Sequence, residues 1–243
     1  MIKHADYVIC DSKNIEAYVQ SVYAPYHPET TFIAYGSSVE RSALPPNADR
    51  AQNWYLEKGI IPYKYYLVVG RFVPENNYET IIREFMKTEV DKDLVIITNV
   101  ETSRFYKSLE TKTGFHKDSR IKFVGTVYDK ELLKRIREDA FAYIHGHEVG
   151  GTNPSLLEAL GSTRLNLLLD VGFNREVAEE GALYWTKEES SLAALIDRLE
   201  GCTEEEKDAL GQLAKERIIQ EYDWKHIIGL YEAVFLNDLS QSG

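Results

Sequence analysis

Short runs of apolar residues alternate with amphipathic stretches from about residue 65 to the end of the chain. The apolar runs are continuous or nearly so, which is typical of parallel strands that are covered on both faces. They predict strands at Tyr65–Gly70, Asp93–Thr98, Ile121–Val124, Phe141–Ile144, Leu165–Leu169 and Ala182–Trp185. Helices are predicted between them at Tyr78–Met86, Ser103–Thr111, Lys130–Glu138, Asn153–Leu160 and Arg175–Glu180. The strict alternation of strands and helices predicts βαβ units, and therefore an α/β fold with a doubly wound parallel sheet.

The two ends of the chain follow other patterns. The last third is predicted to be helical, at Ser190–Leu199, Thr203–Glu221 and Trp224–Leu236. The first part predicts a strand, a helix and a strand, at Asp6–Cys10, Lys13–Tyr23 and Thr31–Tyr35. Such a piece is too small to form a core alone. We therefore expect residues 1–45 to be the remnant of a preceding domain with the start of a linker, and residues 46–238 to form the main domain.

Composition and charge narrow the classes of function. The 243 residues include 28 basic and 39 acidic ones, a net charge of −11, which argues against binding a nucleic-acid backbone. Cys10 and Cys202 are isolated and form neither a disulfide framework nor a metal-binding pair. The N-terminus lacks the apolar core of a signal peptide, and no apolar run approaches the length of a membrane span. We expect a soluble, cytoplasmic chain, with a peripheral position at the inner face of the membrane as a further option.

The first segment with candidate chemistry is Gly70-Arg71-Phe72-Val73-Pro74-Glu75-Asn76-Asn77, between a predicted strand and a helix. Ligands of open α/β sheets bind beyond the carboxyl ends of the strands. Asn77 suits the helix N-cap, which would leave the following amides free for an anion, and Arg71 offers a fixed positive fork for a diphosphate. The alternative is that Arg71 pairs with a surface carboxylate and the two asparagines only shape the turn.

The second segment is His145-Gly146-His147-Glu148-Val149-Gly150-Gly151-Thr152-Asn153-Pro154-Ser155-Leu156-Leu157-Glu158. Asn153 suits the N-cap and Pro154 the first helical position, so that the amides of Ser155 and Leu156 would face a phosphate. Glu158 follows about 6 Å further along the helix axis, where it could accept hydrogen bonds from ribose hydroxyls. The alternative is a surface glutamate without a ligand.

These two motifs at this spacing resemble the donor-binding domain of family-4 GT-B glycosyltransferases. More closely, they resemble a bacterial branch that includes rhamnosyltransferases of cell-surface polysaccharide assembly. The resemblance runs from about Ala5 to Phe235 and includes ADYVICDS and TFIAYG, which close the acceptor domain in that family. It implies a Rossmann-like C-terminal lobe and transfer of a sugar from a nucleotide diphosphate donor with retention of configuration.

The resemblance also implies roles for particular residues. Arg71 would bind the donor diphosphate, Glu158 would hold the ribose, and these two are the candidate catalytic residues. The turn Gly125-Thr126-Val127 would meet the base through backbone groups. The other expected donor-binding residues are Gly70, Asn76, Thr126, Val127, Gly150, Gly151, Thr152, Asn153, Pro154, Ser155 and Leu156.

Two positions depart from the family pattern. Asn76 stands where the broad family usually has Lys, which removes a positive charge from the diphosphate site. Gly150 stands where the family usually has a Glu that touches the donor sugar, so that the sugar must be held differently here. Glu148 lies nearby but is out of register. These departures favour the rhamnosyltransferase-like branch, with dTDP-rhamnose as donor and a growing lipid-linked glycan as acceptor.

Two alternatives of another class remain. The chain could be a non-catalytic nucleotide-sugar-binding module, or a subunit that needs a separate polypeptide or self-association to supply the acceptor lobe. A sugar-nucleotide epimerase would need further acid-base residues that the sequence does not display. His145 and His147 flank Gly146, but no third residue has metal-ligand spacing. We therefore expect neither a metal nor a cofactor, and a structural or sugar-contacting role for the two histidines.

Overall fold

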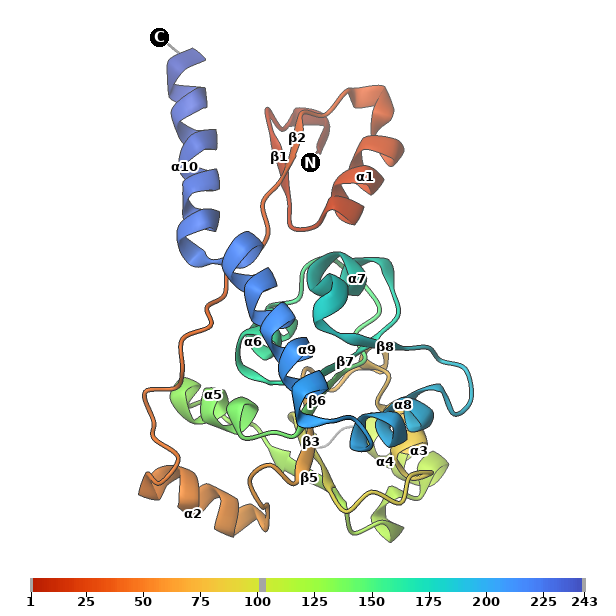
Figure 1. Ribbon diagram of the computed structural model, residues 1–243. Helices are drawn as coiled ribbons and strands as arrows, with labels where there is room; N and C mark the ends of the chain where they lie inside the picture. The colour runs from red at the N-terminus through yellow and green to blue at the C-terminus, as the bar shows by residue number, and fades with distance from the viewer. Residues whose placement is uncertain (1, 101–103, 242–243) are drawn as a thin grey trace.

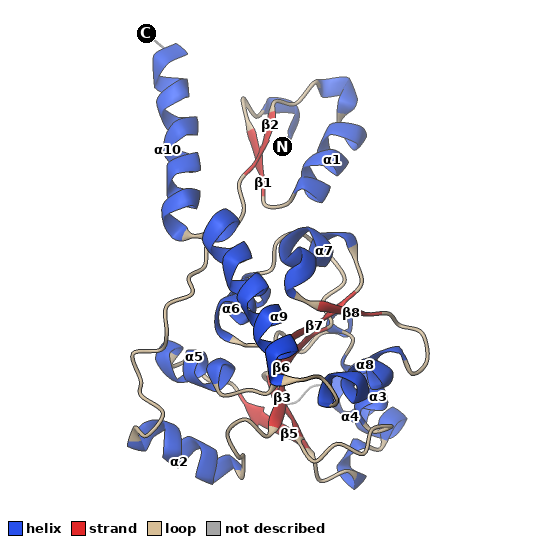
Figure 2. Ribbon diagram, viewed as in Figure 1, coloured by secondary structure: helices blue, strands red, loops and turns tan. Residues whose placement is uncertain are grey.

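A computed structural model of the protein describes residues 2–100 and 104–241. Its centre is a parallel sheet of six strands in the order β5-β4-β3-β6-β7-β8 (Figure 2). The strands are β3 (Tyr65–Val69), β4 (Asp93–Ile97), β5 (Ile121–Gly125), β6 (Ala142–His145), β7 (Asn166–Leu169) and β8 (Leu183–Trp185). The predicted fold class, a doubly wound α/β sheet of Rossmann type, is confirmed.

Ten α-helices are described, and most of them cover the two faces of this sheet. They are α1 (Lys13–Val22), α2 (Asp49–Lys58), α3 (Tyr78–Phe85), α4 (Arg104–Thr113), α5 (Lys130–Glu138), α6 (Pro154–Ser162), α7 (Gly172–Ala178), α8 (Ser191–Glu200), α9 (Glu204–Arg217) and α10 (Trp224–Gln241). A π-helical segment, η6 (Ile218–Tyr222), joins α9 to α10. Short 3₁₀ turns occur at Ile2–His4, Ala24–Tyr26, Pro74–Asn76, Phe115–Lys117 and Glu179–Gly181.

Strand β3 shows why its sequence is continuously apolar. Tyr66 and Val68 pack on one face of the sheet against α3, α4 and α8. Tyr65 and Leu67 pack on the other face against α2, α5 and α6. Because successive side chains of a strand point to opposite faces, a strand that is covered on both sides needs an apolar residue at every position.

The order of the strands reverses between β3 and β6. From β3 the chain proceeds outward to β4 and β5, whereas from β6 it proceeds the other way to β7 and β8. Tyr66 and Leu67 of β3 pair in parallel with Ala142 and Tyr143 of β6. The loops that follow β3 and β6 therefore leave the same edge of the sheet and diverge, which opens a crevice between them.

The N-terminal segment forms a second, two-stranded parallel sheet from β1 (Val8–Cys10) and β2 (Thr30–Phe32), flanked by α1. Figure 1 shows this piece at one end of the molecule, beyond α7 and beside the start of α10. Immediately after β2, Ile33 and Ala34 are buried in the apolar cluster formed by α6, α7, α9 and η6. The boundary between residues 45 and 46 remains a prediction.

The predicted elements agree with the structure to within a few residues, with two differences. Helix α2 was not predicted, because the prolines and polar residues before it read as a linker. The sequence pattern of this helix is weak: only Ala51 and Tyr55 are buried on one face, and Gly59, at φ 60°, is the C-cap. Helix α7 begins at Gly172, earlier than the predicted Arg175. Ser103, the first residue of another predicted helix, lies outside the described residues.

Glu84 of α3 caps α8, a neighbouring helix on the same face of the sheet. Its carboxylate is buried and accepts hydrogen bonds from the amides of Ser190 at 3.1 Å and Ala193 at 3.2 Å, at the N-terminus of α8. Ser190 itself, at φ 66°, gives that helix no side-chain cap. Burial acts to raise the pKa of Glu84, but the bonds from Lys87 and from these two amides outweigh it and hold the pKa below its ordinary value.

Glu84→Gln should therefore lower the free energy of unfolding at pH 7 by about 1–2 kcal/mol, because an amide cannot accept from both backbone groups. A carboxyl whose pKa is lowered on folding stabilises the native state above its unfolded pKa, and this contribution disappears as the pH falls through the folded pKa. Urea unfolding at several pH values should show the gap to the wild type closing in acid. Exposed Glu205→Gln is the control, and a gap that is independent of pH would contradict this account.

A candidate ligand-binding crevice between the ends of β3 and β6

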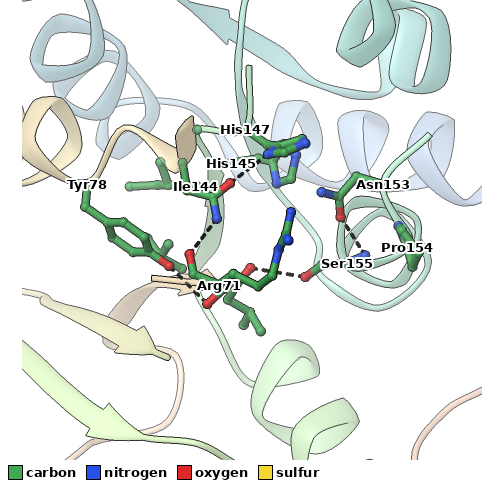
Figure 3. A pocket seen from close by; sticks show the side chains of 13 residues that line it. Arg71, Tyr78, Ile144, His145, His147, Asn153, Pro154 and Ser155 are labelled. Atoms are coloured by element: carbon green, nitrogen blue, oxygen red, sulfur yellow. Dashed lines mark hydrogen bonds between the residues drawn. The ribbon is translucent and has the colours of Figure 1, made fainter. Parts of the chain in front are cut away.

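A cavity of about 280 Å³ opens at the point where the strand order reverses. Its lining comes from the ends of β3 and β6, from the two loops that follow them and from the first turn of α6 (Figure 3). The expected site residues among the lining are Gly70, Arg71, Asn76, Asn153, Pro154 and Ser155. The fold thus brings the two predicted motifs together, although some eighty residues separate them in the sequence.

Arg71 is exposed, and Figure 3 shows its side chain crossing the cavity toward His145. No ion pair joins its guanidinium to any carboxylate of residues 2–100 or 104–241. Its backbone, in contrast, is fixed, because the carbonyl of Arg71 accepts from the amide of Val73 at 2.9 Å and from Nδ2 of Asn76 at 2.7 Å. The alternative that Arg71 pairs with a surface carboxylate finds no support among the described residues.

Asn76 and Asn77 hold the two loops together. Because Nδ2 of Asn76 donates to Arg71, its Oδ1 accepts from Nδ1 of His147 at 2.8 Å. Nδ2 of Asn77 donates to the carbonyl of Gly146 at 2.8 Å and to the carboxylate of Glu148 at 2.9 Å. Asn77 occupies the N-cap position of α3 as predicted, but its left-handed backbone (φ 54°) turns the side chain away from the helix. The predicted N-cap position is thus confirmed, but the side chain joins the two loops instead of bonding to an amide of the helix.

The start of α6 confirms the predicted cap but corrects the predicted free amides. Asn153 is the N-cap, and Pro154 is the first helical residue. Oδ1 of Asn153 accepts from the amide of Ser155 at 2.9 Å, and its carbonyl accepts from the amide of Leu156 at 3.0 Å. These two amides are thus used within the helix end, and the Leu156 side chain is buried in the core.

Other amides are available just before the helix. Within the part of the chain that the structure describes, the amides of Gly151, Thr152 and Asn153 have no hydrogen-bond acceptor. They precede the positive end of the α6 dipole, where an anion is stabilised. Of the residues that the sequence predicted to bind the donor, Gly151, Thr152 and Asn153 therefore keep free amides, whereas Ser155 and Leu156 do not.

The glycines of this loop meet different constraints. Gly150 has φ 116°, a conformation that strains any residue with a Cβ atom. At Gly151 a Cβ would lie 2.1 Å from Oδ1 of Asp11, in the loop after β1. The hydroxyl of buried Thr152 donates to the carbonyl of Asp11, so its side chain faces the N-terminal piece. Glycine at both positions therefore permits the backbone conformation of this loop and its close approach to Asp11, to which Thr152 is hydrogen-bonded.

Glu158 lies outside the cavity, in a neighbouring hollow beside Lys134 and Trp224. One of its oxygens pairs with Arg137 of α5 at 2.6 Å, and its side chain is 52% exposed. The Arg137 side chain is only 5% exposed and also donates to the hydroxyl of Ser155 at 3.4 Å. Nothing in the segment KELLKRIRE distinguishes Arg137 from a solvated arginine, so the sequence alone does not point to this residue.

The remaining expected contacts lie apart from the cavity. Thr126 is exposed and Val127 packs against the core at the end of β5, so their contact with a base stays a prediction.

The two histidines at the end of β6 are held neutral. Burial lowers the pKa of His145 to about 3, and burial also lowers the pKa of half-buried His147. Their ring centroids are 6.1 Å apart. Among the described residues, no group of three or more His, Cys, Asp or Glu side chains is arranged to hold a metal ion.

Comparisons with known proteins agree with this fold. Residues 1–38 match a family described as a domain of unknown function, DUF1972, and no curated protein matches the chain. Among solved structures, the chain is similar to sucrose-phosphate synthase from Thermosynechococcus elongatus (TM-score 0.79, 18% identity, 100% of this chain and 60% of that one). It is also similar to a glycosyltransferase from Rickettsia africae (TM-score 0.82, 12% identity, 96% and 64%). A third is HepE of Anabaena in complex with UDP-glucose (TM-score 0.76, 17% identity, 96% and 64%).

These similarities establish the architecture. The sheet and its helices match the lobes of GT-B glycosyltransferases. The chain spans 60% to 64% of the length of the three structures. None of the described helices is both long and apolar enough to cross a membrane.

The contact between the two loops can be tested at Gly146. A Cβ there would lie 2.4 Å from the carbonyl oxygen of Asn76, so Gly146→Ala must push the loops apart. We expect a loss of about 1–3 kcal/mol in the free energy of unfolding. The control is Gly229→Ala in α10, where a Cβ meets nothing within 4 Å and helix propensity favours alanine by up to about 1 kcal/mol. Chemical denaturation of both variants measures this difference, and equal stabilities would contradict the close approach.

Proposed function

We propose that this crevice binds a nucleotide diphosphate sugar and that the chain supplies the donor-binding lobe of a retaining glycosyltransferase. The observation that carries the proposal is that Arg71, without an ion pair among the described carboxylates, lines the same cavity as the start of α6, and that the amides just before this helix have no acceptor among the described residues. A guanidinium and a helix N-terminus are complementary to the same anion, a diphosphate. Both lie at the switch point of the sheet, where ligands of this class of fold bind.

The same two groups supply the chemistry of transfer. When the bond between the sugar and the diphosphate breaks, negative charge develops on the leaving diphosphate. Arg71 and the amides of Gly151–Asn153 meet that charge with donors that are already oriented, which stabilises the transition state. This role needs no metal ion at the diphosphate.

Glu158 is the proposed ribose contact. Arg137 engages Oε2 of its carboxylate, which leaves Oε1 free to accept from ribose hydroxyls. Because Arg137 also contacts Ser155, it holds the Glu158 carboxylate on the side of α6 where Ser155 lies. The nucleoside would then lie at the Glu158 end and the diphosphate over the first turn of α6, with the sugar toward the histidines.

Two lines of support bear on the ligand class. HepE, whose fold this chain shares, has been solved with UDP and with UDP-glucose. The GGTNPS and PENN segments resemble the rhamnosyltransferase-like branch, so dTDP-rhamnose is the proposed donor and a growing cell-surface polysaccharide precursor the proposed acceptor.

A thermal-shift screen tests the ligand class. A ligand that binds only the native state raises the melting temperature by mass action. We expect dTDP and UDP at millimolar concentration to raise it, dTDP more than UDP, and thymidine much less. If no nucleoside diphosphate changes the melting temperature, the crevice is not a nucleotide site.

Two substitutions separate the proposed contacts. Arg71→Ala should weaken dTDP binding by about 1.5–3 kcal/mol, roughly ten- to 150-fold, and leave thymidine unchanged, because the lost bonds go to a charged group. Glu158→Ala should weaken dTDP and thymidine by the same factor, since both carry the ribose.

Calorimetry on these variants gives the answer, with exposed Arg198→Ala and Glu205→Ala as matched controls. Glu148 is unsuitable as a control, because it pairs with Lys187 and Asn77 and so supports the loop. Loss of thymidine binding in Arg71→Ala would place the arginine at the nucleoside instead.

A further inference from the structure

His145, one of the residues that line the crevice, carries a nitrogen that is not satisfied by a hydrogen bond. Its side chain is 4% exposed, and Nε2 is buried without a hydrogen-bond partner among the described residues. The residue lines the cavity, and Figure 3 shows its ring beside the end of the Arg71 side chain. A buried polar atom without a partner destabilises a protein, so such atoms mark places where a further group belongs.

The neighbours of His145 decide what kind of group fits. The hydroxyl of Tyr143 donates to the carbonyl of Val69 at 3.1 Å. The hydroxyl of Ser155 lies 3.2 Å from this hydroxyl and 3.2 Å from the same carbonyl. With the Tyr143 proton directed at Val69, the Tyr143 hydroxyl accepts from Nδ1 of His145, 3.2 Å away. Nδ1 thus carries the proton of the neutral ring, and Nε2 is left as a bare acceptor. Burial lowers the pKa of His145 to about 3, which keeps the ring neutral at physiological pH.

The diphosphate and the sugar of the proposed ligand differ in whether they can donate a hydrogen bond to this nitrogen. Ionised diphosphate oxygens are acceptors only, and two acceptors repel each other. A sugar hydroxyl, in contrast, is a donor that satisfies a bare imidazole nitrogen. The position is also suitable, because His145 lines the cavity of Arg71 whereas Glu158, the proposed ribose contact, lines a separate hollow.

We infer that Nε2 of His145 accepts a hydrogen bond from a hydroxyl of the transferred sugar, so that this residue discriminates the sugar nucleotide from the bare nucleoside diphosphate. The inference rests on the proposed function and adds the contact that recognises the sugar. The inference includes the proton arrangement in which Tyr143 donates to Val69 and Nδ1 of His145 donates to Tyr143, which makes Nε2 an acceptor.

A pair of substitutions at one position tests this contact. His145→Asn keeps an amide where Nδ1 lies and removes the acceptor at Nε2, whereas His145→Gln places an amide near Nε2. Calorimetry measures the affinities of each variant and the wild type for dTDP and dTDP-rhamnose, and for UDP and UDP-glucose. Circular dichroism and melting temperature verify that the variants are folded.

We expect His145→Asn to bind the nucleoside diphosphate within twofold of the wild type and the sugar nucleotide five- to tenfold more weakly. His145→Gln should recover part of this loss. Equal weakening of both ligands would show that His145 shapes the diphosphate site, and unchanged affinities would show that Nε2 meets only water; either result overturns the inference alone. Failure of the wild type to bind any of the four ligands would overturn the proposed function together with it.

Discussion

The reversal of strand order between β3 and β6 is the constraint on which the rest of the structure depends. These two strands pair in parallel, yet the connections that follow them run to opposite halves of the sheet. No helix can therefore cross the edge between them, and the two loops must face each other over an open crevice. The side chains that line it are brought together by topology, since Arg71 and Asn153 are distant in sequence.

Most polar side chains in the crevice are engaged in holding its walls. Asn76 and Asn77 link the loop after β3 to the loop after β6, and Asn153 caps α6. Because these amides are satisfied within the protein, they leave a small set of groups for a ligand. Among the described residues, that set consists of the Arg71 guanidinium and Nε2 of His145 in the crevice, and the amides of Gly151–Asn153 in the loop that leads into α6. It combines a cation and free donors for an anion with one acceptor for a hydroxyl group.

The sequence predicted the sheet because a strand that is buried on both faces must be apolar throughout. This pattern can be recognised without knowing which strands and helices pack against it. It also predicted the cap at Asn153 and Pro154, which depends only on local backbone chemistry. The amides of Ser155 and Leu156 were assigned wrongly because the same cap consumes them. Arg137 and the acceptor state of His145 were beyond prediction, since each depends on residues that only the folded chain brings close, Glu158 in one case and Tyr143 in the other.

We have proposed that the diphosphate of a nucleotide sugar lies between Arg71 and the first turn of α6. A crystal structure of the protein with dTDP bound would show where the diphosphate lies. We expect diphosphate oxygens within hydrogen-bond distance of the Arg71 guanidinium and of the amides of Gly151–Asn153, with the ribose at Glu158. A nucleotide bound elsewhere on the chain, or a diphosphate that turns away from Arg71 toward solvent, would contradict it.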